Sequence, residues 1–332
     1  MVPARAHWGS RLAFILAAAG SAIGLGNIWK FPYMAGMNGG GYFVLIYLSC
    51  ILLVGLPVLI AELYIGQQAQ CDAVEAFEKL DKPKTLWRLP GWLGLLSAFM
   101  ILSFYSVVGG WILDFEFQAI TDKFHQLNDQ QVQEQLSLLP WRQILSHFVF
   151  MVLSLGIVIK GISAGLERWS KILMPALFIM LAGLLIHSFF LDGFGPAVTF
   201  LFSTENSSLN PQGVVEAVGQ AFFSLSLGMG AIITYGSYLN KKENLLKLSL
   251  TVAFLDTLIA LLAGLVIFSV VFSFGLEPGS GPGLIFSTLP LLFSKMPGGT
   301  VLAVIFFLLV TFAALTSAVS ILEVVVTYLN DR

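Results

Sequence analysis

Eight long apolar runs with few charged residues constrain this chain more than any other feature. A helix needs about 20 apolar residues to cross the hydrocarbon core of a bilayer, and most of these runs reach that length. Their apolar residues are continuous, whereas strands of a membrane barrel would alternate. The sequence therefore predicts an all-α integral membrane protein in contact with the lipid bilayer. Its eight spans are expected near residues 12–35, 41–65, 89–118, 143–159, 169–190, 213–240, 248–274 and 297–329.

The composition excludes several other classes of protein. With 57% hydrophobic and 11% charged residues, the chain of 332 residues resembles membrane proteins and not soluble domains. A formal charge of −2 and the lack of a long basic run argue against a nucleic-acid partner. The two cysteines are too few for a disulfide framework. The sequence shows no nucleophile beside a base and no histidine cluster, so an enzyme is not expected.

Basic residues are unevenly distributed between the predicted loops. Cytoplasmic loops retain Lys and Arg, and a cytoplasmic amino terminus would place thirteen of the seventeen basic residues on that side. We therefore expect a multi-pass protein of the cell (inner) membrane with its amino terminus in the cytoplasm. Eight spans return the carboxyl terminus to the same side.

Two of the predicted spans contain clustered glycines near their middle. The span 12–35 holds the run GSAIGLGN, and the span 213–240 holds SLSLGMG. Glycines weaken a helix and free backbone groups that lipid cannot satisfy, so these groups must face protein, ions or substrate. For any single glycine, close packing of helices is the alternative interpretation. The two spans lie five apart and run in opposite directions, as in an inverted repeat with discontinuous helices.

Longer segments around these glycines carry a family resemblance. The runs RAHWGSRLAFILAAAGSAIGLGNIWKFPY, NGGGYF, VGQAFFSLSLGMGAIITYGSY and FAALTSAVS resemble signature segments of the neurotransmitter:sodium symporters, in particular bacterial sodium-dependent amino-acid transporters. The resemblance implies a LeuT-type fold in one transporter domain over residues 1–332, with a first repeat near 10–190 and a partial second repeat near 211–332. Family members have eleven or twelve spans, so a chain of eight would be a fragment without the later ones.

The resemblance implies sodium ions, two in number, and no organic cofactor. Sodium is a hard cation that takes oxygen ligands. The positions that match the family pattern for the first ion are the Ala22 carbonyl, Asn27, Ser224 and Asp256, with the substrate carboxylate as a further ligand. Those for the second ion are the carbonyls of Gly20, Ile23 and Ala313 and the hydroxyls of Thr316 and Ser317. Hydroxyls in membrane helices commonly bond to their own helix, which is the alternative for each Ser or Thr.

Asp256 is the most informative of these residues. A carboxylate in mid-span costs roughly 2.5 to 3.5 kcal/mol and usually marks an ion or proton pathway. Many relatives carry an amide here and balance charge with chloride or with a Glu one turn later, where this sequence has Ala260. Transport is therefore expected not to need chloride, and proton antiport through Asp256 stays open. Glu62, by the family pattern, is expected to support the unwound backbone of the span 213–240.

The resemblance also implies a central substrate site. The carboxylate of an amino acid would lie against unwound backbone at Ala22, Gly24, Leu25 and Gly26, where free N–H groups suit an anion. Ser224 is expected to serve both this substrate and the first ion. A pocket without charged residues would hold the substrate side chain, and its members are Ser21, Ile101, Tyr105, Phe223, Ser226, Met229, Ser317 and Ile321. Such a pocket suits a neutral, hydrophobic or aromatic L-amino acid.

Residues on either side of this site match the gates of the family. From the inner to the outer side they are Arg5, Asp331, Tyr238, Tyr105, Phe223 and Lys30. The acidic partner expected for Lys30 would fall in the missing spans. The predicted function is sodium-coupled symport of an amino acid by alternating access. The alternative is a truncated homologue that retains substrate and sodium binding but does not transport, and the oligomeric state is left open.

Overall fold

The computed structural model describes residues 7–81, 86–124, 140–204, 211–278 and 283–331, which are almost entirely helical and contain no strand. The α-helices are α1 (Arg11–Ala22), α2 (Phe31–Met37), α3 (Gly41–Cys50), α4 (Leu56–Ala69), α5 (Ala73–Leu80), α6 (Leu89–Ile120), α8 (Pro140–Val158), α9 (Arg168–Ser188), α10 (Phe194–Phe202), α11 (Pro211–Ser224), α12 (Ala231–Ser237), α13 (Leu245–Ser273), α14 (Leu289–Lys295) and α15 (Gly299–Asn330). Turns of π-helix cover Gly26–Lys30, Ile51–Gly55, Ile162–Glu167 and Leu284–Thr288, and a 3-10 turn covers Leu86–Arg88.

Most of the predicted spans correspond to continuous helical segments. Among the described residues, six segments are long and apolar enough to cross a membrane: Gly41–Ala69, Leu86–Ile120, Trp141–Val158, Ile162–Ser188, Leu245–Ser273 and Gly299–Asn330. A seventh candidate is the pair Arg11–Ala22 and Gly26–Met37, which is bent by 46° at its break. The remaining predicted span, 213–240, is divided into α11 with 14 residues and α12 with 7. Neither of these two helices alone reaches the length of about 20 residues that a bilayer requires.

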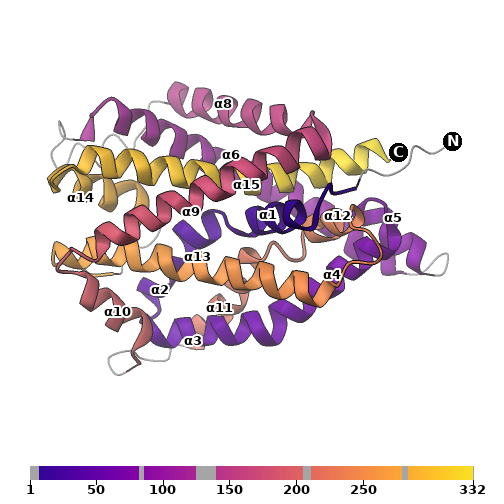
Figure 1. Ribbon diagram of the computed structural model, residues 1–332, viewed down its shortest axis with the longest axis horizontal. Coiled ribbons are helices and arrows are strands. Elements are labelled where there is room, and N and C mark those ends of the chain that lie inside the picture. Colours follow the sequence, from indigo (N-terminus) through magenta and orange to yellow (C-terminus); the bar gives the residue numbers. More distant parts are fainter. Residues whose placement is uncertain (1–6, 82–85, 125–139, 205–210, 279–282, 332) are drawn as a thin grey trace.

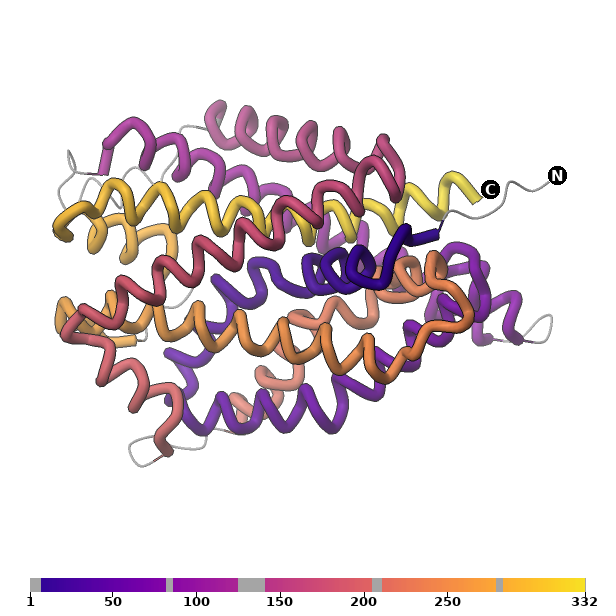
Figure 2. Tube along the Cα trace, viewed as in Figure 1, coloured from indigo at the N-terminus to yellow at the C-terminus, as the bar shows by residue number. Residues whose placement is uncertain are grey.

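The long helices lie side by side, and the amino-terminal segment runs through the middle of the molecule (Figures 1 and 2). Helix α1 is capped by Ser10, whose hydroxyl accepts a hydrogen bond from the Ala13 amide at 3.1 Å. It contacts α9, α13 and α15, and small residues allow this close approach. A Cβ added at Gly20 would lie 3.2 Å from the Met174 sulfur and 3.3 Å from the Thr316 Cβ. The helix at the centre of the bundle is therefore packed through alanine and glycine.

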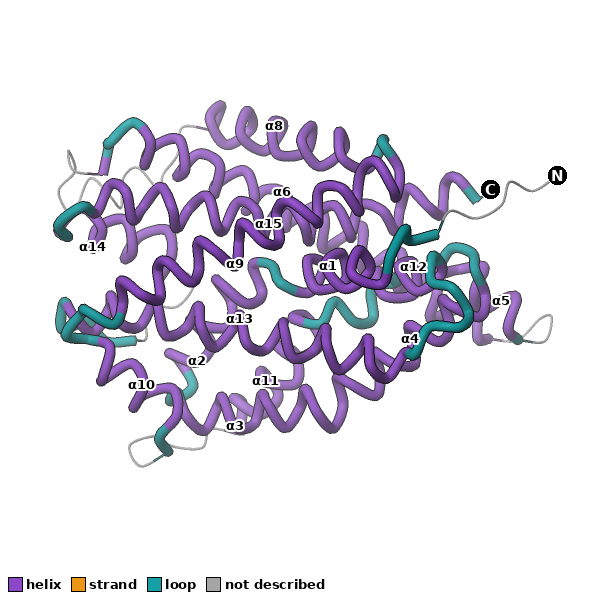
Figure 3. The backbone as a smooth tube through the Cα atoms, in the orientation of Figure 1, coloured by secondary structure: helices purple, strands orange, loops and turns teal. Residues whose placement is uncertain are grey.

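The two interrupted helices break side by side near mid-length (Figure 3). Residues 23–25 separate α1 from the turn Gly26–Lys30, and residues 225–230 separate α11 from α12. Within the second break Gly228 and Gly230 adopt φ angles of 78° and 77°, which glycine tolerates without a steric cost. Ser226 also has a positive φ, 56°, and its hydroxyl donates to the Ser21 carbonyl at 2.9 Å. The breaks are thus linked to each other, and all of their residues except Gly228 are buried.

Short helices connect the long ones, and the sequence pattern did not indicate α5 or α10. Helix α5 is capped by Asp72, whose carboxylate accepts from the amides of Val74 at 2.8 Å and Glu75 at 3.2 Å. Helices α10 and α14 follow α9 and α13 at the opposite end of the molecule (Figure 1). These helices are too short to be recognised as spans, and they fold against the ends of the bundle.

Candidate functional site

A narrow cavity, with about 10 Å³ of space for the centre of a water molecule, lies between the two breaks. All eight residues that were expected to surround a substrate side chain line it, namely Ser21, Ile101, Tyr105, Phe223, Ser226, Met229, Ser317 and Ile321. Ala22, Gly24 and Gly26 complete its wall, and no lining residue is ionisable except the Tyr105 phenol. Leu25 and Ser224, also expected at the substrate, are buried beside this cavity and do not line it.

The unwound backbone of the first break turns its amides toward polar side chains. The Gly24 amide donates to Asn27 Oδ1 at 3.2 Å, and the Leu25 amide donates to the Tyr105 hydroxyl at 3.2 Å. A Cβ at Gly24 would collide with the Ser317 hydroxyl and lie 2.7 Å from that of Tyr105. A side chain at this position would displace both hydroxyls, so the glycine allows the backbone of the break to approach them closely.

A second cavity, of about 180 Å³, lies on the side of the breaks away from α1. Tyr105 and Phe223 line both cavities and therefore separate them. Lys30 also lines this second cavity, and its Nζ lies 4.5 Å from the centroid of the Phe223 ring, within range of a cation–π interaction. Sequence reasoning left Lys30 without an acidic partner, whereas in the structure it interacts electrostatically with Glu216 of α11.

Three of the four residues expected at the first ion site, Asn27, Ser224 and Asp256, lie in direct contact. Asn27 Nδ2 donates to Asp256 Oδ1 at 2.7 Å and to the Asp256 carbonyl at 2.9 Å, while the Ser224 hydroxyl reaches Asp256 Oδ2 at 2.7 Å. Ala22, the fourth, is the last residue of α1 and lines the central cavity. Asn27, Ser224 and Asp256 are fully buried, and among the described residues no Lys, Arg or His pairs with Asp256. A buried carboxylate with only neutral neighbours favours the binding of a cation.

Two residues of this cluster were missed by sequence reasoning. The Tyr47 hydroxyl of α3 donates to Asp256 Oδ2 at 3.4 Å and lies 3.2 Å from the Ser224 hydroxyl. Gln220 Nε2 donates to the Gly26 carbonyl at 2.7 Å, and its Oε1 is buried without a hydrogen bond to any described residue. The only signal in the sequence is a tyrosine or a glutamine within an apolar run. The sequence pattern does not reveal that these side chains lie on the helix faces next to the interrupted helices.

The residues expected at the second ion site lie where α1 packs against α15. The Ser317 hydroxyl donates to the carbonyls of Ser21 at 3.0 Å and Gly20 at 3.4 Å. The Thr316 hydroxyl instead bonds within its own helix, to the carbonyls of Ala313 at 3.0 Å and of Phe312 at 3.1 Å. Ile23 is fully buried and has an extended backbone with ψ of 94°, so its carbonyl lies outside the regular helix. These groups form a set of oxygens, two of which are hydroxyls able to turn toward a cation.

Glu62 of α4 supports the second break. Its Oε1 accepts a hydrogen bond from the Gly228 amide at 2.7 Å, in the position that the sequence comparison suggested. Its Oε2 is buried without a hydrogen bond to any described residue. The carboxylate therefore satisfies an amide that the interruption of the helix leaves free.

The expected inner gate is only partly described. The Tyr238 hydroxyl bonds to Glu323 at 2.8 Å and to Thr327 at 2.7 Å, while the Trp8 ring packs edge-on against Tyr238 with centroids 6.1 Å apart. Asp331 is exposed, and its carboxylate lies within 4.8 Å of those of Asp72 and Glu75. Arg5, its expected partner, lies outside the described residues. We call the end of the bundle that holds Trp8 the amino-terminal end. Aromatic and polar side chains pack together there.

Two interrupted helices around a central cavity, with a buried carboxylate beside it, define a membrane transporter that couples solute to cation. The model of the sodium:neurotransmitter symporter family matches residues 5–137 and 123–332 of the chain. The chain therefore belongs to this family, whose members are transporters and not enzymes.

Individual relatives agree with this assignment. The chain is 41% identical to the uncharacterized sodium-dependent transporter YhdH of Bacillus subtilis over 323 residues, which are 96% of this chain and 71% of that protein. It is 38% identical to an uncharacterized sodium-dependent transporter of Haemophilus influenzae, over 99% of this chain and 74% of that protein. The crystal structure of MhsT in complex with L-phenylalanine matches with a TM-score of 0.90 and 46% identity, over 98% of this chain and 74% of that one. The predicted all-α LeuT-type fold and the dependence on sodium are confirmed at the level of the family.

Proposed function

We propose that this protein carries out sodium-coupled symport of a neutral, hydrophobic or aromatic L-amino acid by alternating access. The uncharged cavity between the two breaks is the observation that supports this proposal most. Its backbone amides at Gly24 and Leu25 suit a carboxylate, and its apolar wall, with the flexible Met229, suits a large side chain. The related MhsT is described with L-phenylalanine bound, which is a ligand of this class.

The proposed coupling uses two sodium ions. The first would lie among the oxygens of Ala22, Asn27, Ser224 and Asp256, and the second among those of Gly20, Ile23, Ala313, Thr316 and Ser317. Two ions that move down a potential of about 100 mV and a tenfold gradient release roughly 7 kcal/mol. This free energy would suffice for about 10⁵-fold accumulation of a zwitterion.

We also propose that transport does not need chloride. Asp256 supplies one negative charge beside the first ion, and its neighbours Asn27, Ser224 and Tyr47 are neutral. A sodium ion there would neutralise the carboxylate without an added anion. Replacement of chloride by gluconate should therefore leave uptake unchanged, and loss of uptake would contradict the proposal.

The proposed cycle is alternating access in the cell (inner) membrane, with the amino terminus in the cytoplasm. In this cycle the interrupted helices, together with α3, α4 and α13, would rock against α6, α8, α9 and α15. Tyr105 and Phe223 would close the cavity on the outer side. Trp8, Tyr238 and Glu323 would close it on the inner side. This orientation is supported by the distribution of basic residues, and accessibility of a cysteine placed near Trp8 to a membrane-impermeant reagent would test it.

The first experiment is binding of labelled L-phenylalanine and L-leucine to the purified chain, with sodium or potassium as the cation. A sodium-dependent component of binding should be present and should be lost in Asp256→Ala and Thr316→Ala, while Asp192→Asn, on an exposed carboxylate, should retain it. Sodium-independent binding at the central site would refute the proposed coupling. The alternative function, a homologue that binds but does not transport, predicts this same binding without sodium-driven uptake in liposomes.

A further inference from the structure

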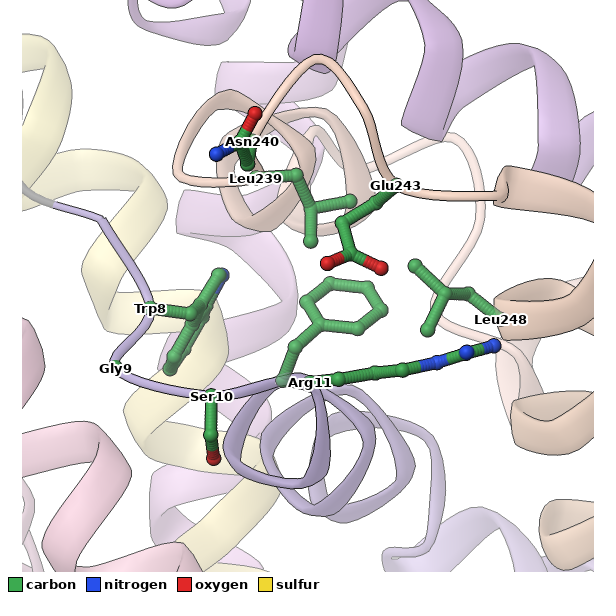
Figure 4. A pocket seen from close by; sticks show the side chains of 9 residues that line it. Trp8, Gly9, Ser10, Arg11, Leu239, Asn240, Glu243 and Leu248 are labelled. Carbon is green, nitrogen blue, oxygen red and sulfur yellow. The ribbon is translucent and has the colours of Figure 1, made fainter.

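A third cavity, of about 180 Å³, lies at the amino-terminal end of the bundle. Its wall is formed by the start of α1, by the connection between α12 and α13, and by the first turn of α13, with the residues Trp8, Gly9, Ser10, Arg11, Phe14, Leu239, Asn240, Glu243 and Leu248 (Figure 4). It shares no lining residue with the central cavity. Whatever binds here would therefore bind separately from the proposed substrate.

Two opposite charges point into this cavity from different walls. The Arg11 side chain extends from the start of α1 beneath Leu248, and the Glu243 carboxylate descends from the connection that follows α12 (Figure 4). Within the described part of the chain, neither side chain forms an ion pair or a side-chain hydrogen bond. A cavity that presents both an unpaired guanidinium and an unpaired carboxylate is suited to a ligand that carries both charges.

The wall between these charges is apolar and held in place. Phe14 and Leu248 are fully buried, and the Trp8 ring is fixed by a hydrogen bond from its Nε1 to the Tyr235 carbonyl at 3.1 Å. Gln67 Nε2 of α4 donates to the Asn240 carbonyl at 2.8 Å, which anchors the connection that carries Glu243. Because these groups are ordered before a ligand arrives, less conformational entropy is lost on binding.

We propose that this cavity is a second ligand site, independent of sodium, for a small zwitterion with an apolar substituent. The guanidinium of Arg11 would pair with the carboxylate or phosphate of the ligand, and Glu243 with its ammonium group. The apolar substituent would pack on Trp8 and Leu239. A free hydrophobic amino acid has this chemistry, and the headgroup of an ethanolamine phospholipid shares the two charges.

The test uses the full chain with Asp256→Ala, which disables the proposed central site, in phosphatidylcholine nanodiscs and potassium buffer. Labelled L-phenylalanine should bind at one saturable site. Arg11→Gln and Glu243→Gln should each weaken binding about tenfold or more, as expected for the loss of a charge-assisted hydrogen bond. Lys242→Gln and Glu277→Gln, which remove exposed charges outside the cavity, should leave it unchanged. Phenethylamine and 3-phenylpropionate, each with one charge, should compete at least tenfold less well than phenylalanine.

The outcomes separate the two sources of the zwitterion. If nanodiscs with phosphatidylethanolamine block phenylalanine binding, and Glu243→Gln relieves the block, the lipid headgroup is the natural occupant. If nanodiscs with phosphatidylethanolamine do not block phenylalanine binding, the free amino acid is the natural occupant. The proposal is overturned if neither ligand binds. It is also overturned if Arg11→Gln and Glu243→Gln leave the affinity unchanged while their melting temperatures match that of the parent protein. Failure of the proposed function would instead be seen in the chain without Asp256→Ala, as a loss of sodium-dependent binding that leaves this site intact.

Discussion

Replacement of Asp256 by asparagine tests the proposed sodium site most directly. The substitution keeps the size of the side chain and removes its charge. One oxygen of the amide can still accept from Asn27 Nδ2 and the Ser224 hydroxyl, which now lie 2.7 and 2.9 Å from Asp256 Oδ1. The new NH₂ group can donate to the hydroxyl oxygen of Tyr47 or Ser224. The local packing is therefore expected to survive, so that a change in binding reports the lost charge.

The size of the effect follows from the surroundings of the carboxylate. Asp256 is fully buried, and among the described residues no cation balances it. Opposite unit charges about 4 Å apart attract by about 4 kcal/mol at an effective dielectric constant of about 20, which sets an upper limit. Interactions with a charged partner are typically worth about 1.5 to 3 kcal/mol. We expect the sodium affinity to fall roughly 10- to 100-fold.

The assay is a sodium titration of labelled L-phenylalanine binding, in parent protein, Asp256→Asn and the exposed control Asp192→Asn. The half-saturating sodium concentration should rise only in Asp256→Asn. A melting curve of each sample in potassium buffer shows whether the bundle is intact. An unchanged sodium titration in a well-folded Asp256→Asn sample would refute the assignment of this carboxylate as a sodium ligand.

Three further substitutions probe other parts of the site. Gly24→Ala should abolish substrate binding with little loss of stability, because its Cβ would displace the flexible hydroxyls of Ser317 and Tyr105. Normal substrate binding in this variant would contradict the close approach of the Gly24 backbone to these hydroxyls. Phe223→Ala should join the two cavities and raise the dissociation rate of bound phenylalanine about tenfold or more, measured by chase with unlabelled ligand, and an unchanged rate would argue against closure by this ring. Gly66→Ala should lower the melting temperature, at a cost of about 1 to 3 kcal/mol, because its Cβ would meet the rigid carbonyl of Ile233. An unchanged melting temperature for Gly66→Ala would show that α4 and α12 can separate.

Local sequence patterns and the family resemblance together predicted much of the site. The glycine clusters around Gly24 and Gly228 predicted two interrupted helices, and the structure places both breaks side by side. The eight uncharged residues expected around a substrate side chain all line one cavity. Their assignment came from family resemblance, which carries tertiary information that spacing alone does not contain.

Other features required the packed structure. Tyr47 and Gln220 are polar residues within apolar segments, and nothing in the sequence indicates that they reach the breaks. The proximity of Lys30 to Glu216 depends on how α11 lies beside the first span. Arg11 and Glu243 are more than two hundred positions apart, yet they line one cavity. The division of the span 213–240 into two helices also became definite only with the backbone angles of residues 226–230.

The sequence by itself determined the membrane class, the helical fold and the position of the two interruptions. Each of these follows from local properties, because the length of an apolar run and the backbone freedom of glycine act within one segment. The tertiary structure decided which polar groups meet, as Asn27, Ser224 and Asp256 do. These contacts depend on the rotation and crossing angle of whole helices. Rotation and crossing angle arise from packing among segments that are distant in the chain, so no single segment determines them.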